Sequence, residues 1–264
     1  MLTVCCWKWG TLFSARYVNR LRAALERNLH VDHELVCVTE DASGIDLDVR
    51  IVPLPLEYRD TPRCRRRMRI FDRAFAEGIG SRILSIDLDM VLVDDITPLV
   101  DRPEPLVCLK VEHAQVYSGA FMLMDAGVLH DLWLEFQRAP EEYPRRAWPR
   151  GIGSDQAMLN FFLRDKPPIA HWTDRDGFVT YYGAGYERFE HFGVGPNRPT
   201  LPPGARVVVL GSDDKHVMET GAYPWVRQHW DAPLACACHI GGAVSEISLA
   251  RVMACPVHSE ACSS

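Results

Sequence analysis

Two aspartates inside an apolar stretch are the residues of this sequence best placed to do chemistry. Asp87 and Asp89 lie in the segment RILSIDLDMVLV, residues 82–93, which is otherwise largely apolar. Such a run is typical of a central strand of a parallel sheet, and alternate strand residues share a face, so both carboxylates are predicted to point the same way. Because such a pair repels itself without a cation, it favours a divalent-metal or phosphate-handling site. A capped turn with one solvated aspartate is the alternative.

A dense run of arginines precedes this segment. Residues 61–76 read TPRCRRRMRIFDRAFA, in which Met68, Phe71 and Phe75 form an apolar stripe of a predicted helix. The arginines around the stripe can be a solvated helix face, or one or two can turn inward toward a di- or triphosphate. The pattern leaves both open. Nucleic acid is not an expected partner, because the run lacks interleaved aromatics and the chain has a formal net charge of −6.

A third candidate site lies in the segment GIGSDQA, residues 151–157. Ser154 or Asp155 can serve simply as the N-cap of a helix predicted over residues 156–164. The two glycines ahead of them also permit close backbone approach, and Asp155 with Gln156 offers a carboxylate and an amide side by side. Helix capping and ligand binding both fit these residues.

The elements that must position these side chains alternate between strand and helix. Residues 2–7 predict a strand, 17–29 a helix, and 34–39 and 49–54 two further strands. Units of this kind are typical of parallel βαβ construction, in which ligands bind beyond the carboxyl ends of the strands. Downstream, the pattern predicts strands over 107–111 and 117–124 and a helix over 127–138.

Length and composition place the chain among ordinary globular proteins. It has 264 residues, of which 47% are hydrophobic and 24% charged. No apolar stretch approaches the ~20 residues of a transmembrane helix, and the N-terminus lacks the features of a signal peptide. We therefore expect a cytoplasmic protein with reduced, buried thiols at Cys5, Cys6, Cys37, Cys64 and Cys108.

The character of the chain changes after Trp230. We expect one domain over residues 1–230 and a loosely ordered, Cys- and Ala-rich extension over residues 231–264. Zinc binding is an alternative for this extension, although the spacing is not a standard one. Its candidate ligands are Cys236, Cys238, His239, Cys255, His258 and Cys262.

Several segments, taken in order, resemble a known family. They are VCCWKWG with YVNRL, ELVCVTED, RRMRIF, RILSIDLDMVLVDDITPL, YSGAFMLMDAG, GSDQAMLN, and VVVLGSDDKH with PWVRQHW, and together they cover most of residues 2–230. Their order resembles the GT-A type glycosyltransferases, most closely bacterial relatives of glycosyltransferase family 8, the glycogenin and galactosyltransferase group. The resemblance implies an α/β fold, a Rossmann-related mixed sheet flanked by helices that binds a nucleotide-sugar.

The resemblance also assigns expected roles. Asp87 and Asp89 match the DxD motif that holds Mn²⁺ or Mg²⁺ against the donor diphosphate, and Asp155 with Gln156 match the catalytic pair lining the sugar and acceptor site. The implied donor-binding residues are Lys8, Trp9, Arg67, Asp87 and Lys215. The implied activity is metal-dependent, hexosyltransferase-type transfer from a nucleotide-diphosphate-sugar, with a UDP-sugar favoured, to a glycan, lipid or protein acceptor.

Departures from the family pattern keep alternatives open. Leu210-Gly211-Ser212 stands where the family carries its metal-binding histidine, so His216, Asp213 or Asp214 would have to supply the third ligand, and His216 is our candidate. A non-catalytic nucleotide-sugar-binding relative is one alternative. Another is a haloacid-dehalogenase-like phosphatase with Asp87 as nucleophile and Asp89 as general acid. The sequence leaves the sugar, the base, the acceptor and the stereochemistry open.

Overall fold

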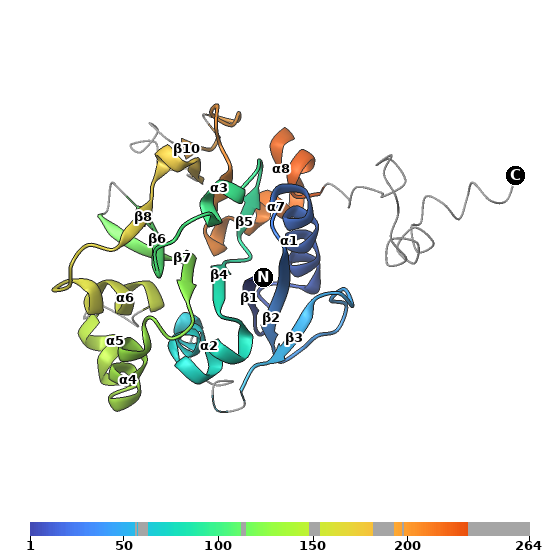
Figure 1. Ribbon diagram of the computed structural model, residues 1–264. Helices are drawn as coiled ribbons and strands as arrows, with labels where there is room; N and C mark the ends of the chain where they lie inside the picture. The colour runs from blue at the N-terminus through green and yellow to red at the C-terminus, as the bar shows by residue number, and fades with distance from the viewer. Residues whose placement is uncertain are drawn as a thin grey trace, which may run out of the picture.

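The computed structural model describes residues 1–55, 57, 63–111, 115–147, 154–181, 193–196 and 198–231. Its centre is a seven-stranded sheet in the order β3-β2-β1-β4-β7-β6-β8 (Figure 1). The strands are β1 (Leu2–Lys8), β2 (His33–Thr39), β3 (Arg50–Pro53), β4 (Arg82–Ile86), β6 (Leu106–Val111), β7 (Val116–Asp125) and β8 (Ala170–Trp172). The predicted α/β fold class is therefore confirmed.

The first four strands of this sheet are parallel. β1 pairs in parallel with both β2 and β4, and β2 pairs in parallel with β3, whereas β7 runs antiparallel to β4 and to β6. The carboxyl ends of β1, β2 and β4 consequently meet at one edge, where parallel sheets place their ligands. Asp87 follows β4 directly at this edge.

A second sheet packs beside the first. Its strands, in the order β10-β9-β11-β5, are β10 (Gly193–Val194), β9 (Phe178–Tyr181), β11 (Val207–Val209) and β5 (Met90–Leu92). The prediction of one continuous strand over residues 82–93 is therefore wrong. β4 ends at Ile86, and residues 87–89 carry the chain into the second sheet, where β5 pairs antiparallel with β11. Asp87 and Asp89 thus lie in a turn between two sheets.

Helices cover both faces of the central sheet (Figure 1). One face carries α1 (Ala15–Asn28), α7 (Lys215–Thr220) and α8 (Pro224–His229), and the other carries α2 (Arg73–Ile79), α4 (His130–Arg138), α5 (Glu142–Ala147) and α6 (Asp155–Leu163). Alternation along β1 explains the two layers, because Val4 and Cys6 pack on one side and Cys5 and Trp7 on the other. Short elements complete the fold: α3 (Thr97–Val100) and the 3₁₀ segments η2 (Arg63–Phe71), η3 (Asp174–Asp176) and η5 (Ser212–Asp214).

The arginine-rich segment differs from its prediction as one helix over residues 61–76. It forms η2, a 3₁₀ segment, up to Phe71, and α2 starts afresh at Arg73. Asp72 separates the two because its backbone is extended, with φ −68° and ψ 122°, which is the conformation of an N-cap residue rather than of a helix interior.

The five cysteines expected to be reduced are free thiols. Burial raises the pKa of Cys108 to about 12, as expected for an inert core thiol. In the part of the chain that the structure describes, no helix has the length and apolar character needed to cross a membrane. The predicted extension after Trp230 and its candidate zinc ligands lie, apart from Asp231, outside the described residues.

Candidate active site

Arg67 brings two of the predicted acidic residues together. It extends from η2 with only 8% of its side chain exposed, and its two terminal nitrogens contact the carboxylates of Asp87 and Asp155. These carboxylates come from the turn after β4 and from the start of α6. Arg67 therefore turns inward rather than into solvent, and the groups that it contacts are carboxylates. Arg65 is buried as well, but its guanidinium lies 3.6 Å from the carboxylate of Glu141 instead.

Three described carboxylates, those of Asp87, Asp89 and Asp155, interact with this single guanidinium. Asp89 is partly buried, and burial raises the pKa of its carboxyl group to about 6, although the charge of Arg67 acts in the opposite direction. Arg67 can neutralise only one of the three carboxylates of Asp87, Asp89 and Asp155. The site is therefore suited to a further cation.

The two sheets hold the turn that carries the aspartate pair. The backbone N–H of Asp87 donates to the Ala120 carbonyl on β7 at 2.9 Å. The carbonyl of Asp89 accepts from the N–H of Leu210, directly after β11, at 3.0 Å. Both aspartates are thus held in place through their backbones.

An irregularity in β7 makes room for Asp155. β6 pairs Cys108 with Met122 but Leu109 with Ser118, so Gly119 and its two successors bulge out of the ladder. A Cβ atom on Gly119 would lie 2.8 Å from Oδ2 of Asp155. Glycine is therefore required here by the close approach of the carboxylate, not by its backbone angles.

The start of α6 confirms the capping role that the sequence offered for Ser154. Ser154 is the N-cap, and its hydroxyl accepts from the N–H of Ala157 at 3.2 Å. Asp155, which is 4% exposed, is thereby available for Arg67. Gln156 is half-buried in the same first turn.

Sequence reasoning assigned no role to Asn160, one turn further along α6. Its side-chain amide accepts from the N–H of Tyr117 at 2.8 Å and donates to the Tyr117 carbonyl at 2.6 Å. It also donates to the Gln156 carbonyl at 2.8 Å. An asparagine inside a helix carries no sequence signal for such contacts, so only the structure reveals them.

Lys8 and Trp9 lie at the carboxyl end of β1, as expected for the loop that would contact a nucleoside. The Lys8 ammonium is buried and donates to the Asp41 carbonyl at 2.8 Å, with the Asp41 carboxylate 3.5 Å away. It therefore points to the loop after β2. Trp9 is half-buried, and the guanidinium carbon of Arg66 lies 5.7 Å from the centroid of its ring.

Lys215 and His216 begin α7. The Lys215 ammonium donates to the Leu12 carbonyl at 3.1 Å, which ties α7 to the loop after β1. His216 Nδ1 lies 3.3 Å from the Asp213 carbonyl. Among the described residues, no three His, Cys, Asp or Glu side chains converge on one metal position, so this conformation does not unite His216 with Asp87 and Asp89.

Solved structures share this architecture. The galactosyltransferase LgtC, solved in complex with donor and acceptor sugar analogs, is 12% identical over 84% of this chain and 96% of its own, with a TM-score of 0.54. The glycosyltransferase GlyE of Streptococcus pneumoniae TIGR4 is 14% identical over 79% of this chain and 55% of its own, also with a TM-score of 0.54. No family model and no curated protein matches the sequence. The chain therefore has the GT-A fold of these glycosyltransferases, as its sequence resemblance predicts.

Proposed function

We propose that the chain is a metal-dependent glycosyltransferase that transfers a hexosyl group from a nucleotide-diphosphate-sugar, with a UDP-sugar favoured, to a glycan, lipid or protein acceptor. The observation that carries the proposal is the contact of Arg67 with both Asp87 and Asp155, at the carboxyl edge of the sheet. This contact joins a candidate metal site to a candidate sugar site within a GT-A fold.

The residues at the edge of the sheet fit a divalent cation. Asp87 and Asp89 offer hard oxygen ligands in a site with excess negative charge. Mg²⁺ is commonly held by one or two carboxylates together with substrate phosphates rather than by a complete protein cage. Two carboxylates, with no third protein ligand among the residues that the structure describes, therefore suit a cation that arrives with a diphosphate. When bound, Mn²⁺ or Mg²⁺ would neutralise the charge that grows on the leaving diphosphate.

The other residues act by binding and orientation. Arg67 supplies a fixed positive charge between the diphosphate and sugar positions, and Lys215 is our candidate for a second contact to the diphosphate. Asp155 and Gln156, at the start of α6, would orient the sugar relative to the acceptor. Lys8 and Trp9 would border the nucleoside at the end of β1.

Substitution of the aspartate pair tests the proposal. We expect Asp87→Asn and Asp89→Asn to lower metal-dependent UDP-sugar affinity at least tenfold, about 1.4 kcal/mol, because each removes one charged oxygen ligand. The backbone bonds of both residues remain, so the folded state should persist. Isothermal titration calorimetry of UDP-sugars with and without Mn²⁺ measures the affinity, and circular dichroism checks the fold.

Asp94→Asn is the matched control. Asp94 is an exposed aspartate of the following turn, and its carboxylate accepts from the N–H of Asp95 at 2.8 Å. Its replacement should leave donor affinity unchanged. Wild-type turnover in both Asp87→Asn and Asp89→Asn would refute the proposal. Donor binding that needs no metal and gives no turnover would favour the non-catalytic relative.

The phosphatase alternative makes a separate prediction. A nucleophilic Asp87 would have to attack phosphorus while its carboxylate is paired with Arg67, and such pairing weakens a nucleophile. Phosphate release from simple phosphomonoesters, abolished by Asp87→Asn, would nevertheless establish that alternative. Its absence, together with sugar transfer, supports the transferase.

A further inference from the structure

Asn160 connects the two segments that form the candidate sugar site. Its amide makes three hydrogen bonds of 2.6 to 2.8 Å, two with the peptide groups of Tyr117 on β7 and one with the Gln156 carbonyl on α6. The amide is therefore used as both donor and acceptor. A hydrogen-bond pattern of this kind fixes one orientation of the side chain.

The position of Tyr117 in the sheet explains why β7 needs this side chain. The last residue that β4 pairs with on β7 is Phe121, so Tyr117 lies beyond the end of that neighbouring strand. Asn160 supplies one donor and one acceptor to the backbone of Tyr117, as a neighbouring strand would. The irregular register with β6 begins immediately after it, between Ser118 and Met122.

The segment held in this way contacts the candidate catalytic carboxylate. Gly119 lies two residues after Tyr117, and Asp155 lies five residues before Asn160. A Cβ at Gly119 would come within 2.8 Å of the Asp155 carboxylate and 3.5 Å of Nη2 of Arg67. The spacing between β7 and α6 at Asn160 therefore sets the spacing at Asp155. A displacement on the order of 1 Å at a reacting centre can cost about a hundredfold in rate.

We propose that Asn160 is a positioning residue of the sugar site, which holds the start of α6 at the distance from β7 that places Asp155 and Gln156. This inference rests on the proposed glycosyltransferase function. The three hydrogen bonds of Asn160 join Tyr117 and Gln156, not Asp155 or Arg67. Its effect would therefore be transmitted through the backbones of Tyr117 and Gln156.

Two variants of Asn160 distinguish the loss of its hydrogen bonds from the loss of its side-chain volume. Asn160→Ala removes all three hydrogen bonds. Asn160→Asp keeps the shape and the acceptor for the Tyr117 N–H, but it cannot donate to the two carbonyls at neutral pH. We expect kcat to fall at least tenfold in both variants, whereas the Kd of UDP alone changes less than twofold, because UDP lacks the sugar that α6 would position.

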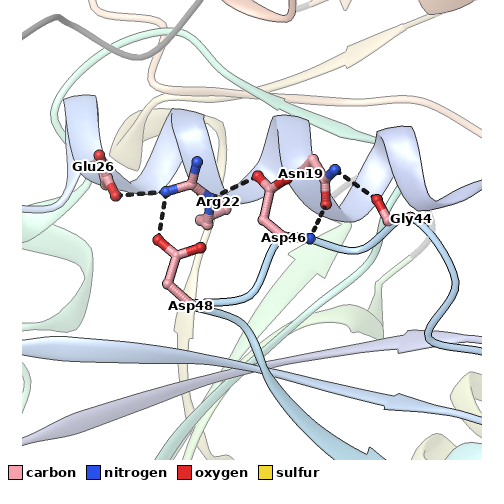
Figure 2. Close-up of polar contacts among 6 residues, drawn as sticks. All are labelled: Asn19, Arg22, Glu26, Gly44, Asp46 and Asp48. Carbon is pink, nitrogen blue, oxygen red and sulfur yellow. Dashed lines mark hydrogen bonds and ion pairs between the residues drawn. The ribbon is translucent and has the colours of Figure 1, made fainter. Parts of the chain in front are cut away.

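Asn19 on α1 provides a matched control (Figure 2). Its amide accepts from the N–H of Asp46 at 3.0 Å and donates to the Gly44 carbonyl at 2.9 Å, so it also holds a backbone segment against a helix. Figure 2 shows Arg22 of the same helix contacting Asp46 as well. Asn19→Ala should lower the urea midpoint in a similar way to Asn160→Ala and leave kcat unchanged.

Amide hydrogen exchange gives a readout that does not depend on turnover. Asn160→Ala should accelerate exchange over residues 117–121 at least tenfold, and Asn19→Ala should not. Unchanged exchange in Asn160→Ala overturns the positioning role whether or not the chain is a transferase. Unchanged kcat in an active enzyme overturns it equally. If the wild type transfers no sugar, the proposed function fails, and the exchange result still decides whether Asn160 holds β7 against α6.

Discussion

Arg67 shows how one residue can link two chemical tasks. Burial alone lowers the pKa of its guanidinium, but the charge of Asp155 and its hydrogen bond act in the opposite direction, and the net effect raises the pKa. Arg67 therefore stays charged in the interior. Its charge holds Asp87 of the candidate metal site and Asp155 of the candidate sugar site in a common network.

Substitution of Gly119 tests the close packing around Asp155 and Arg67. We expect Gly119→Ala to lower kcat at least tenfold and to destabilise the fold by about 1–3 kcal/mol, because its Cβ would lie 2.8 Å from the Asp155 carboxylate. Sugar transfer assays and urea denaturation measure the two effects.

Gly78→Ala is the control, since Gly78 is exposed on α2 with no atom within 4 Å of an added Cβ. That change should stabilise by about 0.5–1 kcal/mol. Equal activity in both variants would contradict the packing argument.

The residues of the site differ in how far sequence could predict them. Two aspartates in an apolar run are a rare pattern, so Asp87 and Asp89 could be located from sequence. The pattern of the run alone could not distinguish Arg67 from Arg65 or Arg66, because a run of arginines has no periodicity that marks one inward direction, and only the family resemblance singled out Arg67. Arg65 is in fact also buried, next to Glu141. The role of Asn160 depends on contacts between segments more than 40 residues apart, which no local pattern encodes.

At the scale of elements, sequence predicted the strands better than their ends. The predictions for β1, β2 and β3 hold within one or two residues, because apolar runs bounded by Gly, Pro and acidic residues mark buried parallel strands. The division of residues 82–93 between β4 and β5 was missed. The apolar residues resume at Met90 in the same periodicity, and only the pairing of β5 with β11 places them in another sheet.

The pairing of β2 with β3 gives a prediction about pH. Arg50 on β3 donates to both carboxylate oxygens of Glu34 on β2, at 2.9 and 2.8 Å. These hydrogen bonds lower the pKa of Glu34 below its ordinary value of 4.5. The stabilisation is therefore full above pH 4.5 and is lost as the pH falls through the lowered pKa.

Glu34→Gln should reveal this loss. Because the Arg50 side chain is 38% exposed, we expect a destabilisation of only about 1 kcal/mol at pH 7. The difference in the free energy of unfolding between the variant and the wild type should shrink below pH 4.5, as the wild-type carboxylate becomes protonated. Urea denaturation at pH 7 and pH 3 measures it. Glu77→Gln, at an exposed position of α2, is the control and should show no such pH dependence. If the difference in the free energy of unfolding between Glu34→Gln and the wild type grows on acidification, the stabilising role of the Glu34–Arg50 pair is contradicted.

At the scale of the whole molecule, α1 joins the first and last described segments of the chain. Arg16 contacts the carboxylate of Asp231 at 2.7 Å, Arg20 donates to the Asp231 carbonyl at 2.8 Å, and Arg27 donates to the His229 carbonyl at 2.6 Å. The sequence predicted a helix over residues 17–29 but not the partners of its arginines, because these partners lie about 200 residues away. Local alternation of strands and helices is enough to predict the class of fold. The contacts between α1 and residues 229–231 form only in the folded chain, so no local pattern predicts them.

Substitution of Trp230 tests whether the packing of residues 229–231 against α1 stabilises the whole fold. Its ring is 4% exposed and packs edge-on against Tyr17 of α1, with centroids 5.3 Å apart. The core cluster that contains both residues also includes Val4 of β1 and Val208 of β11. Loss of the ring should therefore destabilise both sheets together, and we expect Trp230→Ala to cost about 3–5 kcal/mol.

Urea denaturation followed by far-ultraviolet circular dichroism and by tryptophan fluorescence measures this cost. The two transitions should coincide and shift together to lower urea, since the cluster spans both sheets. Leu47→Ala is the control, because Leu47 is fully exposed and its replacement should change stability by less than about 0.5 kcal/mol. A separate early transition in Trp230→Ala, with the main one unmoved, would mean that α8 frays alone. The arginines of α1 would then hold the end of the described chain in place without stabilising the sheet beneath it.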